Sequence, residues 1–142
     1  MYQDILFPVD LNHDASWIGV LPSVIKYCRA FQARLHIVTV VPDFGMPMVG
    51  GFFPKNFSAK AMQDADQRLR VLVDTHVPSD IQVRHIVAEG VAYKEVLRVA
   101  KEIKADLIIM ASHRPELGDF LLGPNAERVV RHAETSVLVV RN

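Results

Sequence analysis

The sequence contains a single cysteine and has no excess of charge of either sign. One cysteine, Cys28, cannot form a disulfide framework or a cysteine metal site. The 16 lysines and arginines equal in number the 16 aspartates and glutamates, so an extended nucleic-acid surface is not expected. No apolar run approaches the roughly 18 residues of a membrane helix, and the start, MYQDILFPVD, lacks the features of a signal peptide. We therefore expect a cytoplasmic protein that binds neither nucleic acid nor membrane.

The common phosphate-binding motifs are also missing. There is no Gly-Lys-Ser or Gly-Lys-Thr, which excludes a Walker loop, and no GxGxxG, which argues against classical NAD binding. A response-regulator receiver needs an acidic pair after its first strand and an aspartate at the end of its third. Here those positions read Val-Asp-Leu and Val-Ala-Glu. The six histidines show no metal-ligand spacing, so we expect no metal held by histidine.

What the sequence does contain is an alternation of strand and helix signals. Half of the residues are hydrophobic, and 142 residues are enough for one domain that spans residues 1–142. Apolar runs rich in Val and Ile predict buried strands at 5–9, 35–41, 81–87, 107–110 and 137–140. Helical spacing predicts helices at 16–33, from an N-cap at Ser58, at 92–104 and at 125–132. Pro22 either kinks the first helix or marks its true start.

This alternation predicts an α/β fold, a Rossmann-like, doubly wound, five-stranded parallel sheet in the order 3-2-1-4-5 with helices on both faces. Ligands bind to such sheets where connections leave neighbouring strands in opposite directions, here at the carboxyl ends of strands one and four. The loops at that point read VDLNHD and ASHRPELGDFLLGPN. We therefore expect the binding site to lie between these two loops.

The residues of the two loops each allow two interpretations. Asp10 can accept hydrogen bonds from a ribose hydroxyl or, as a turn aspartate, from nearby backbone amides. Gly123 and Pro124 suit the tight start of a helix, whose free amides either favour a phosphate or bind nothing. Arg114, next to His113, offers a planar donor fork to a phosphate or else pairs with an acidic neighbour on the surface.

The sequence does not indicate a catalytic centre. Ser112 and His113 are adjacent, which rarely directs two side chains at each other, and no acidic residue can be assigned to orient the histidine. With no positioned nucleophile or general base, any hydrolysis is expected to be slow. Cys28 lies on the apolar face of its helix and is predicted to be in the core. Residues 42–58 are too long for a simple connection and predict a lid or an oligomer contact, or else a loop folded onto its own domain.

Several segments together resemble the universal stress protein family. These are ILFPVD at the start, the turn Ala88-Glu89-Gly90, and ADLIIMASHR followed by LLGPNAERVVRHAETSVLVVR. The resemblance covers essentially the whole chain and is weakest between residues 42 and 80. It is closest to short, single-domain bacterial members whose loop begins Ala-Ser-His-Arg-Pro.

The resemblance implies a cytosolic stress-response protein that binds an adenine nucleotide, ATP, in the crevice and responds to it as a regulatory module. Mg²⁺ would bridge the phosphates without a protein cage of its own. The resemblance also implies a homodimer paired through the last strand, Ser136 to Arg141, and leaves pairing into tetramers open. The resemblance implies that Pro8 and Val9 form the wall of the crevice and that Asp10 lies at the ribose or phosphates. The backbone of Val40 would bond adenine. Along the ribose and phosphates would run Ala111, Ser112, His113 and Arg114, and at the phosphates would lie Gly123, Asn125 and Ala126.

The chain departs from the family's ATP-binding pattern of Gly, two residues, Gly, nine residues, Gly, then Ser or Thr. Ala111 and Arg114 replace the first two glycines, and eight residues, 115–122, separate Arg114 from Gly123. Pro124 replaces the Ser or Thr and lacks both the hydroxyl and the amide donor. Two alternatives therefore accompany ATP binding: a dimeric interaction protein of the same fold that binds no nucleotide, and a slow ATPase.

Overall fold

The chain folds around a five-stranded sheet in the order β3-β2-β1-β4-β5, with every adjacent pair parallel. This computed structural model describes residues 1–42, 57–112 and 122–141. The strands are β1 (Asp4–Pro8), β2 (Arg34–Val41), β3 (Val83–Glu89), β4 (Leu107–Ala111) and β5 (Ser136–Val140). The helices are η1 (Asp14–Ser16), α1 (Leu21–Phe31), α3 (Phe57–His76), α4 (Ala92–Glu102) and α5 (Pro124–His132). The predicted fold class and strand order are confirmed.

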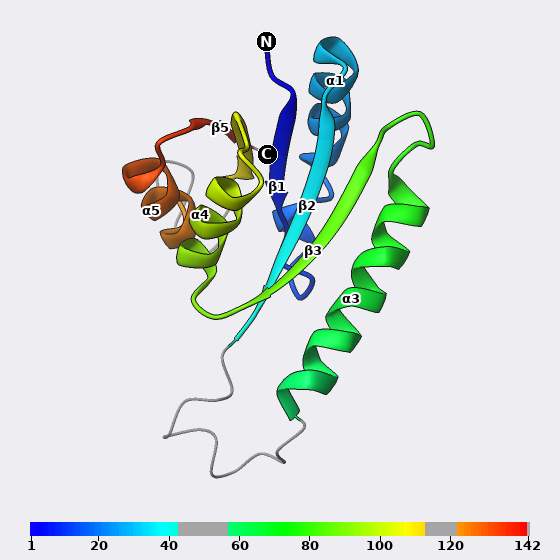
Figure 1. Cartoon of the computed structure of the whole chain (residues 1–142), viewed down its shortest axis with the longest axis vertical. Coiled ribbons are helices and arrows are strands. Elements are labelled where there is room, and N and C mark those ends of the chain that lie inside the picture. Colours follow the sequence, from blue (N-terminus) through cyan, green and yellow to red (C-terminus); the bar gives the residue numbers. More distant parts are fainter. Residues whose placement is uncertain (43–56, 113–121, 142) are drawn as a thin grey trace.

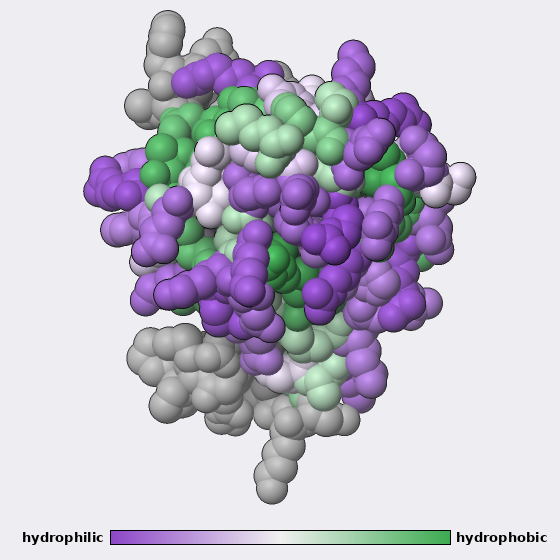
Figure 2. Space-filling model, turned by 45° about the horizontal axis from the view of Figure 1, so that its top comes forward, coloured by the Kyte–Doolittle hydropathy of each residue, from purple (hydrophilic) through white to green (hydrophobic). Residues whose placement is uncertain are grey.

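Helices cover both faces of the sheet, and the alternation of side chains along each strand divides the core in two (Figure 1). Ile5 and Phe7 of β1 pack with residues of α1 and α3. Leu6 of β1 and Val38 of β2 pack on the opposite face, with residues of α4 and α5. Because both faces are buried, the strands read as nearly continuous apolar runs. The outer surface seen in Figure 2 is mainly hydrophilic, with smaller hydrophobic areas between.

The first helix is shorter than predicted. It begins at Leu21 rather than at residue 16, with Pro22 in its first turn. Proline has no N–H to donate and is tolerated there because the amides of the first turn have no acceptor within the helix. Ile18, predicted on the apolar face, precedes α1 and its residue is 52% exposed. Cys28 is buried as predicted, and burial raises the pKa of its thiol to about 11.

The prediction that Ser58 caps the second long helix is wrong. Ser58 is already within α3, and its hydroxyl donates to Glu89 Oε1 at 2.9 Å. The structure thus uses Ser58 to join the start of α3 to the end of β3. On the same helix Ala65, Leu69 and Leu72 are buried. The segment predicted as a lid or oligomer contact, residues 42–58, lies outside the described residues except for its ends.

A polar cluster ties together the amino ends of the central strands. Asp4 on β1 accepts hydrogen bonds from Arg34 Nη2 at 2.9 Å and from His36 Nε2 at 3.0 Å, both on β2. Burial by itself would raise the pKa of the Asp4 carboxyl, but these hydrogen bonds and the positive charge of their donors hold that pKa below its ordinary value. Asp106, just before β4, accepts from the backbone N–H groups of Gln3 and Asp4. The register of β1 against its two neighbours is therefore fixed at the end of the sheet opposite to the predicted site.

Candidate nucleotide site

A pocket of about 520 Å³ lies at the carboxyl ends of β1 and β4, where the strand order reverses. The residues that line it come from the loop after β1, the end of β2, the start of α4, the end of β4 and the start of α5. Among them are the predicted Pro8, Val9, Asp10, Val40, Ala111, Ser112, Gly123, Asn125 and Ala126. The predicted His113 and Arg114 lie outside the described residues. The fold thus brings together every predicted site residue that it describes.

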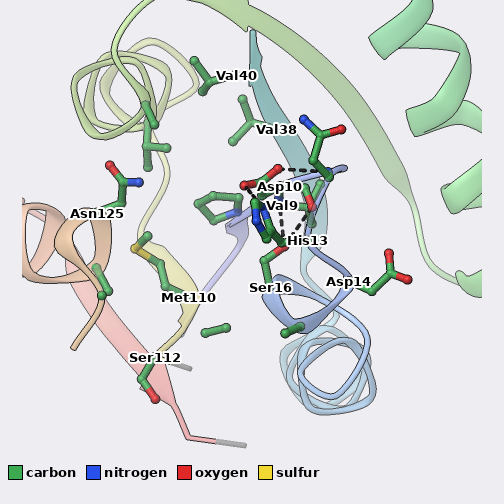
Figure 3. Close-up of a pocket in the computed structure, with 18 of the residues that line it drawn as sticks. Val9, Asp10, His13, Asp14, Ser16, Val38, Val40, Met110, Ser112 and Asn125 are labelled. Carbon is green, nitrogen blue, oxygen red and sulfur yellow. Dashed lines mark hydrogen bonds and ion pairs between the residues drawn. The ribbon is translucent and has the colours of Figure 1, made fainter. Parts of the chain in front are cut away.

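Asp10 is held by its own loop in the manner of a turn aspartate. Its Oδ1 accepts from the backbone N–H of Asn12 at 2.9 Å, and its Oδ2 is 2.8 Å from Nδ1 of His13. The backbone N–H of Asp10 donates to Oγ of Ser16, and that hydroxyl donates back to the Asp10 carbonyl. Figure 3 shows Asp10, His13 and Ser16 gathered on one side of the pocket. The turn interpretation of Asp10 is therefore confirmed, and the residue also lines the pocket.

Arg68 connects this loop to the long helix α3. Its Nη2 donates to the carbonyl of Leu11 at 2.8 Å, and its Nη1 to Oδ1 of Asn12 at 3.3 Å. The helix α3 packs on the sheet through its buried face. Arg68 therefore anchors to a fixed helix the loop between β1 and η1, which has no regular structure of its own. The Asp10 loop is thus held both by its own hydrogen bonds and by a neighbouring element.

The opposite wall of the pocket is the start of α5. Gly123 is the N-cap, with φ −62° and ψ 155°, and it makes no side-chain capping hydrogen bond. The next residue, Pro124, has no N–H, so the first amides of the helix belong to Asn125 and Ala126, while the amide of Glu127 donates to the Gly123 carbonyl. Amides in the first turn have no acceptor within the helix and attract anions. Pro124 is exposed and is not among the residues that line the pocket.

The backbone of Val40 faces the pocket because β2 extends beyond β1. Val38 directs its carbonyl toward β1, where it accepts from the Val9 amide at 2.8 Å. Val41 directs its carbonyl toward β3, where it accepts from Gly90 at 2.9 Å. Since successive residues of a strand point their backbone groups to alternate sides, Val40 points its N–H and C=O to the side of β1, past the end of that strand.

The described residues contain no group of three or more His, Cys, Asp or Glu side chains that could hold a metal ion. In the described part of the lining, the carboxylates are those of Asp10 and Asp14. The Asp10 carboxylate is engaged by Asn12 and His13. The described part of the lining therefore does not by itself form a protein cage for a cation.

Several lining residues were not predicted. They are Asn12, His13, Asp14, Ala15 and Ser16 in the loop after β1, together with Val38, Pro42, Ala92, Val96 and Met110. Val38 follows from the period of two along β2, which places it on the same face as Val40. His13 had no sequence signal of its own, because only the turn at Asp10 brings its ring to the carboxylate. None of the helices in the described part of the chain is long and apolar enough to cross a membrane.

Comparison with known proteins agrees with this architecture. Residues 1–141 match the sequence profile of the Universal stress protein family. The chain belongs to the universal stress protein family. Universal stress protein G of Escherichia coli O157:H7 is 28% identical over 147 aligned positions, which cover 99% of this chain and all of that protein.

Solved structures of universal stress proteins share the fold. The universal stress protein UspA of Lactobacillus plantarum superimposes with a TM-score of 0.75 at 22% identity, covering 99% of this chain and 98% of the other. A universal stress protein crystallised in complex with cAMP superimposes with a TM-score of 0.62, also at 22% identity, covering 99% and 97% of the two chains. Similarity at 22% identity establishes the fold of the chain but does not identify its ligand.

Proposed function

We propose that this universal stress protein binds ATP in the pocket between the carboxyl ends of β1 and β4 and acts as a nucleotide-dependent regulatory module. The observation that carries the proposal is the convergence on one pocket of a carboxylate, free strand backbone and uncapped helix amides. Its volume, about 520 Å³, falls within the roughly 300–1,000 Å³ of small-molecule sites. A related universal stress protein forms a complex with another adenine nucleotide, cAMP.

The parts of the pocket suit the parts of a nucleotide. The Val40 backbone can pair with the edge of adenine, while the apolar side chains of Val38 and Met110 provide surfaces for the base. The amides of Asn125 and Ala126 can hold phosphate oxygens at the positive end of α5. Asp10 can still accept a hydrogen bond from a ribose hydroxyl, because a carboxylate has about four acceptor positions and Asn12 and His13 use two of them. Mg²⁺, when bound, would neutralise the phosphates.

We further propose that the protein acts as a cytoplasmic homodimer paired through β5. This strand is at the edge of the sheet, and Val137, Leu138, Val139 and Val140 are each half-buried in the single chain. A second copy of the same edge can complete the unpaired backbone groups. Binding of ATP would then bias shape or assembly by its difference in affinity for the two states.

The test begins with the purified protein. It is denatured, any released nucleotide is identified by chromatography, and the emptied, refolded protein is titrated with ATP, ADP, AMP and cAMP by calorimetry. We expect ATP to bind with micromolar affinity. No released nucleotide and no heat with any of the four ligands would leave the dimeric interaction protein as the better reading.

Gly123→Val locates the binding in this pocket. Gly123 is buried, and its extended backbone is accessible to valine, so the variant should fold while its side chain crowds the phosphate position. We expect its ATP affinity to fall by more than about tenfold, the order of 1–3 kcal/mol that overpacking costs. Gly19→Val, at an exposed glycine outside the pocket lining, is the matched control and should bind as the wild type does. Equal affinities in the two variants would place ATP elsewhere.

A further inference from the structure

The described part of the pocket lining contains acidic side chains and no lysine or arginine. Among the described residues that line the pocket, the titratable side chains are Asp10, His13 and Asp14. The phosphates of ATP therefore meet two carboxylates, and like charges repel. The start of α5 supplies only partial positive charge from its amides. Within this described lining, His13 is the side chain that can become a cation near neutral pH.

His13 is also oriented for such a contact. An ionised carboxylate can only accept, so the ring of His13 carries its proton on Nδ1 toward Oδ2 of Asp10, at 2.8 Å. This bond fixes the ring and leaves Nε2 for a ligand. When the ring is protonated, Nε2 becomes a charged donor, and a hydrogen bond from a cation to phosphate is among the stronger ones.

Among the described residues, the other charged side chains near His13 are two carboxylates and one arginine. From its own loop, Asp10 and Asp14 face the pocket. From α3, Arg68 approaches the loop but is bound to the Leu11 carbonyl and to Asn12, and it does not line the pocket. The described lining from β2, β4, α4 and α5 is neutral, with Ser112 and Asn125 as its polar side chains.

We infer that His13 is a phosphate-binding residue of this pocket and that nucleotide binding is coupled to its protonation. The inference rests on the nucleotide site proposed above and specifies which part of the ligand the loop after β1 recognises. Affinity for phosphorylated ligands should rise as the pH falls from 8 to 6, and binding should take up a proton. A nucleoside without phosphate should show neither effect.

Calorimetry with defined ligands tests the inference. ATP, cAMP and adenosine are titrated at pH 6 and pH 8 with EDTA present, in two buffers whose ionisation enthalpies differ, so that proton uptake is counted. The diester phosphate of cAMP does not titrate in this range, so any pH dependence of its binding belongs to the protein. We expect both phosphorylated ligands to bind about tenfold more tightly at pH 6, the scale of one charge-assisted hydrogen bond, and adenosine to be unaffected.

The diagnostic variant is His13→Gln, whose amide can still donate to Asp10 but cannot carry a charge. It should lose the pH dependence for cAMP and bind cAMP about tenfold more weakly than the wild type at pH 6. His132→Gln, an exposed histidine at the far end of α5, is the matched control and should behave as the wild type does. Melting temperatures establish that both variants are folded.

The outcomes separate the two proposals. Nucleotide binding in the wild type without pH dependence, or with a dependence that His13→Gln retains, would overturn the role of His13 while the nucleotide site stands. Absence of binding by any of the three ligands at both pH values would overturn the site and the role of His13 together.

Discussion

At the scale of single residues, the pair of Asp4 and His36 shows how a buried polar contact can fix the register of strands. The side chain of His36 is only 9% exposed, and its Nε2 donates to Asp4. The other ring nitrogen, Nδ1, is buried without a hydrogen-bond partner among the described residues. A buried polar atom without a hydrogen-bond partner destabilises the fold, and loss of the Nε2 contact would leave both ring nitrogens in that state.

Asp4→Asn tests this contact. The substitution weakens the hydrogen bonds from Arg34 and His36 at the buried end of β1, and we expect the free energy of unfolding at pH 7 to fall by about 1–2 kcal/mol. The pKa of Asp4 is lowered in the fold. The ionised carboxyl therefore stabilises the fold fully at pH values above its ordinary pKa near 4, and this stabilisation is lost as the pH falls through the lower pKa of the folded state. The difference between wild type and variant should therefore shrink below pH 4 in urea unfolding.

Asp80→Asn is the matched control for that experiment. Asp80 pairs with Arg29 in an exposed ion pair, and the hydrogen bond from Arg29 lowers its pKa as well. Exposed pairs contribute little because water and salt screen them. An equal loss in the free energy of unfolding in both variants would show that the buried contact of Asp4 stabilises the fold no more than an exposed ion pair does.

At the scale of elements, the position of the pocket loop depends on a helix that is distant in sequence. Arg68 lies 57 residues from Leu11, whose carbonyl it binds. We expect Arg68→Met to bind ATP about three- to tenfold more weakly, the effect of losing roughly 1 kcal/mol of hydrogen bonding that holds the loop. The melting temperature should change little, because Arg68 is exposed and the buried face of α3 is unchanged.

Arg70→Met provides the comparison for this variant on the same helix. Arg70 is also exposed, but it pairs with Asp66 one turn away rather than with the loop. Calorimetric affinity for ATP should therefore remain at the wild-type value. A loss of affinity in Arg70→Met equal to that in Arg68→Met would assign the effect to the charge of α3 rather than to the hold on the loop.

At the scale of the whole molecule, the proposed homodimer depends on the free edge of β5. The backbone N–H of Ser112 donates to the Val140 carbonyl, so the backbone groups of Val140 point inward to β4. By alternation those of Val139 point outward, to the free edge. Val139→Pro therefore removes a donor from the edge while the ladder to β4 is retained.

We expect Val139→Pro to convert the dimer to a monomer in analytical ultracentrifugation, with nucleotide affinity retained at low protein concentration. Leu138→Pro removes an inward donor instead, and it should destabilise the fold, which a thermal melt would detect. A Val139→Pro protein that remains dimeric would show that the copies pair through another surface.

Much of the architecture could be predicted from the sequence because its signals are local. Apolar runs of four to eight residues report burial on both faces, and the alternation with helices dictates parallel crossovers. The start of α1 at Leu21 and the position of Ser58 within α3 were harder, because a helix boundary depends on competing local hydrogen bonds. The apolar residue Ile18 continues the helical spacing, yet it lies ahead of the first turn that Pro22 favours.

The sequence by itself determined the fold class, because hydrophobic periodicity and the handedness of crossovers favour a parallel, doubly wound sheet. The common form of that sheet then gave the strand order and the edge at which the pocket lies. The tertiary structure alone decided how the site residues meet. It placed His13 on Asp10, bound Arg68 to a loop 57 residues away, and left Pro124 exposed and outside the pocket lining. Such contacts depend on the paths of loops in space, which are set by packing and by hydrogen bonds between distant segments and leave no periodic trace in the sequence.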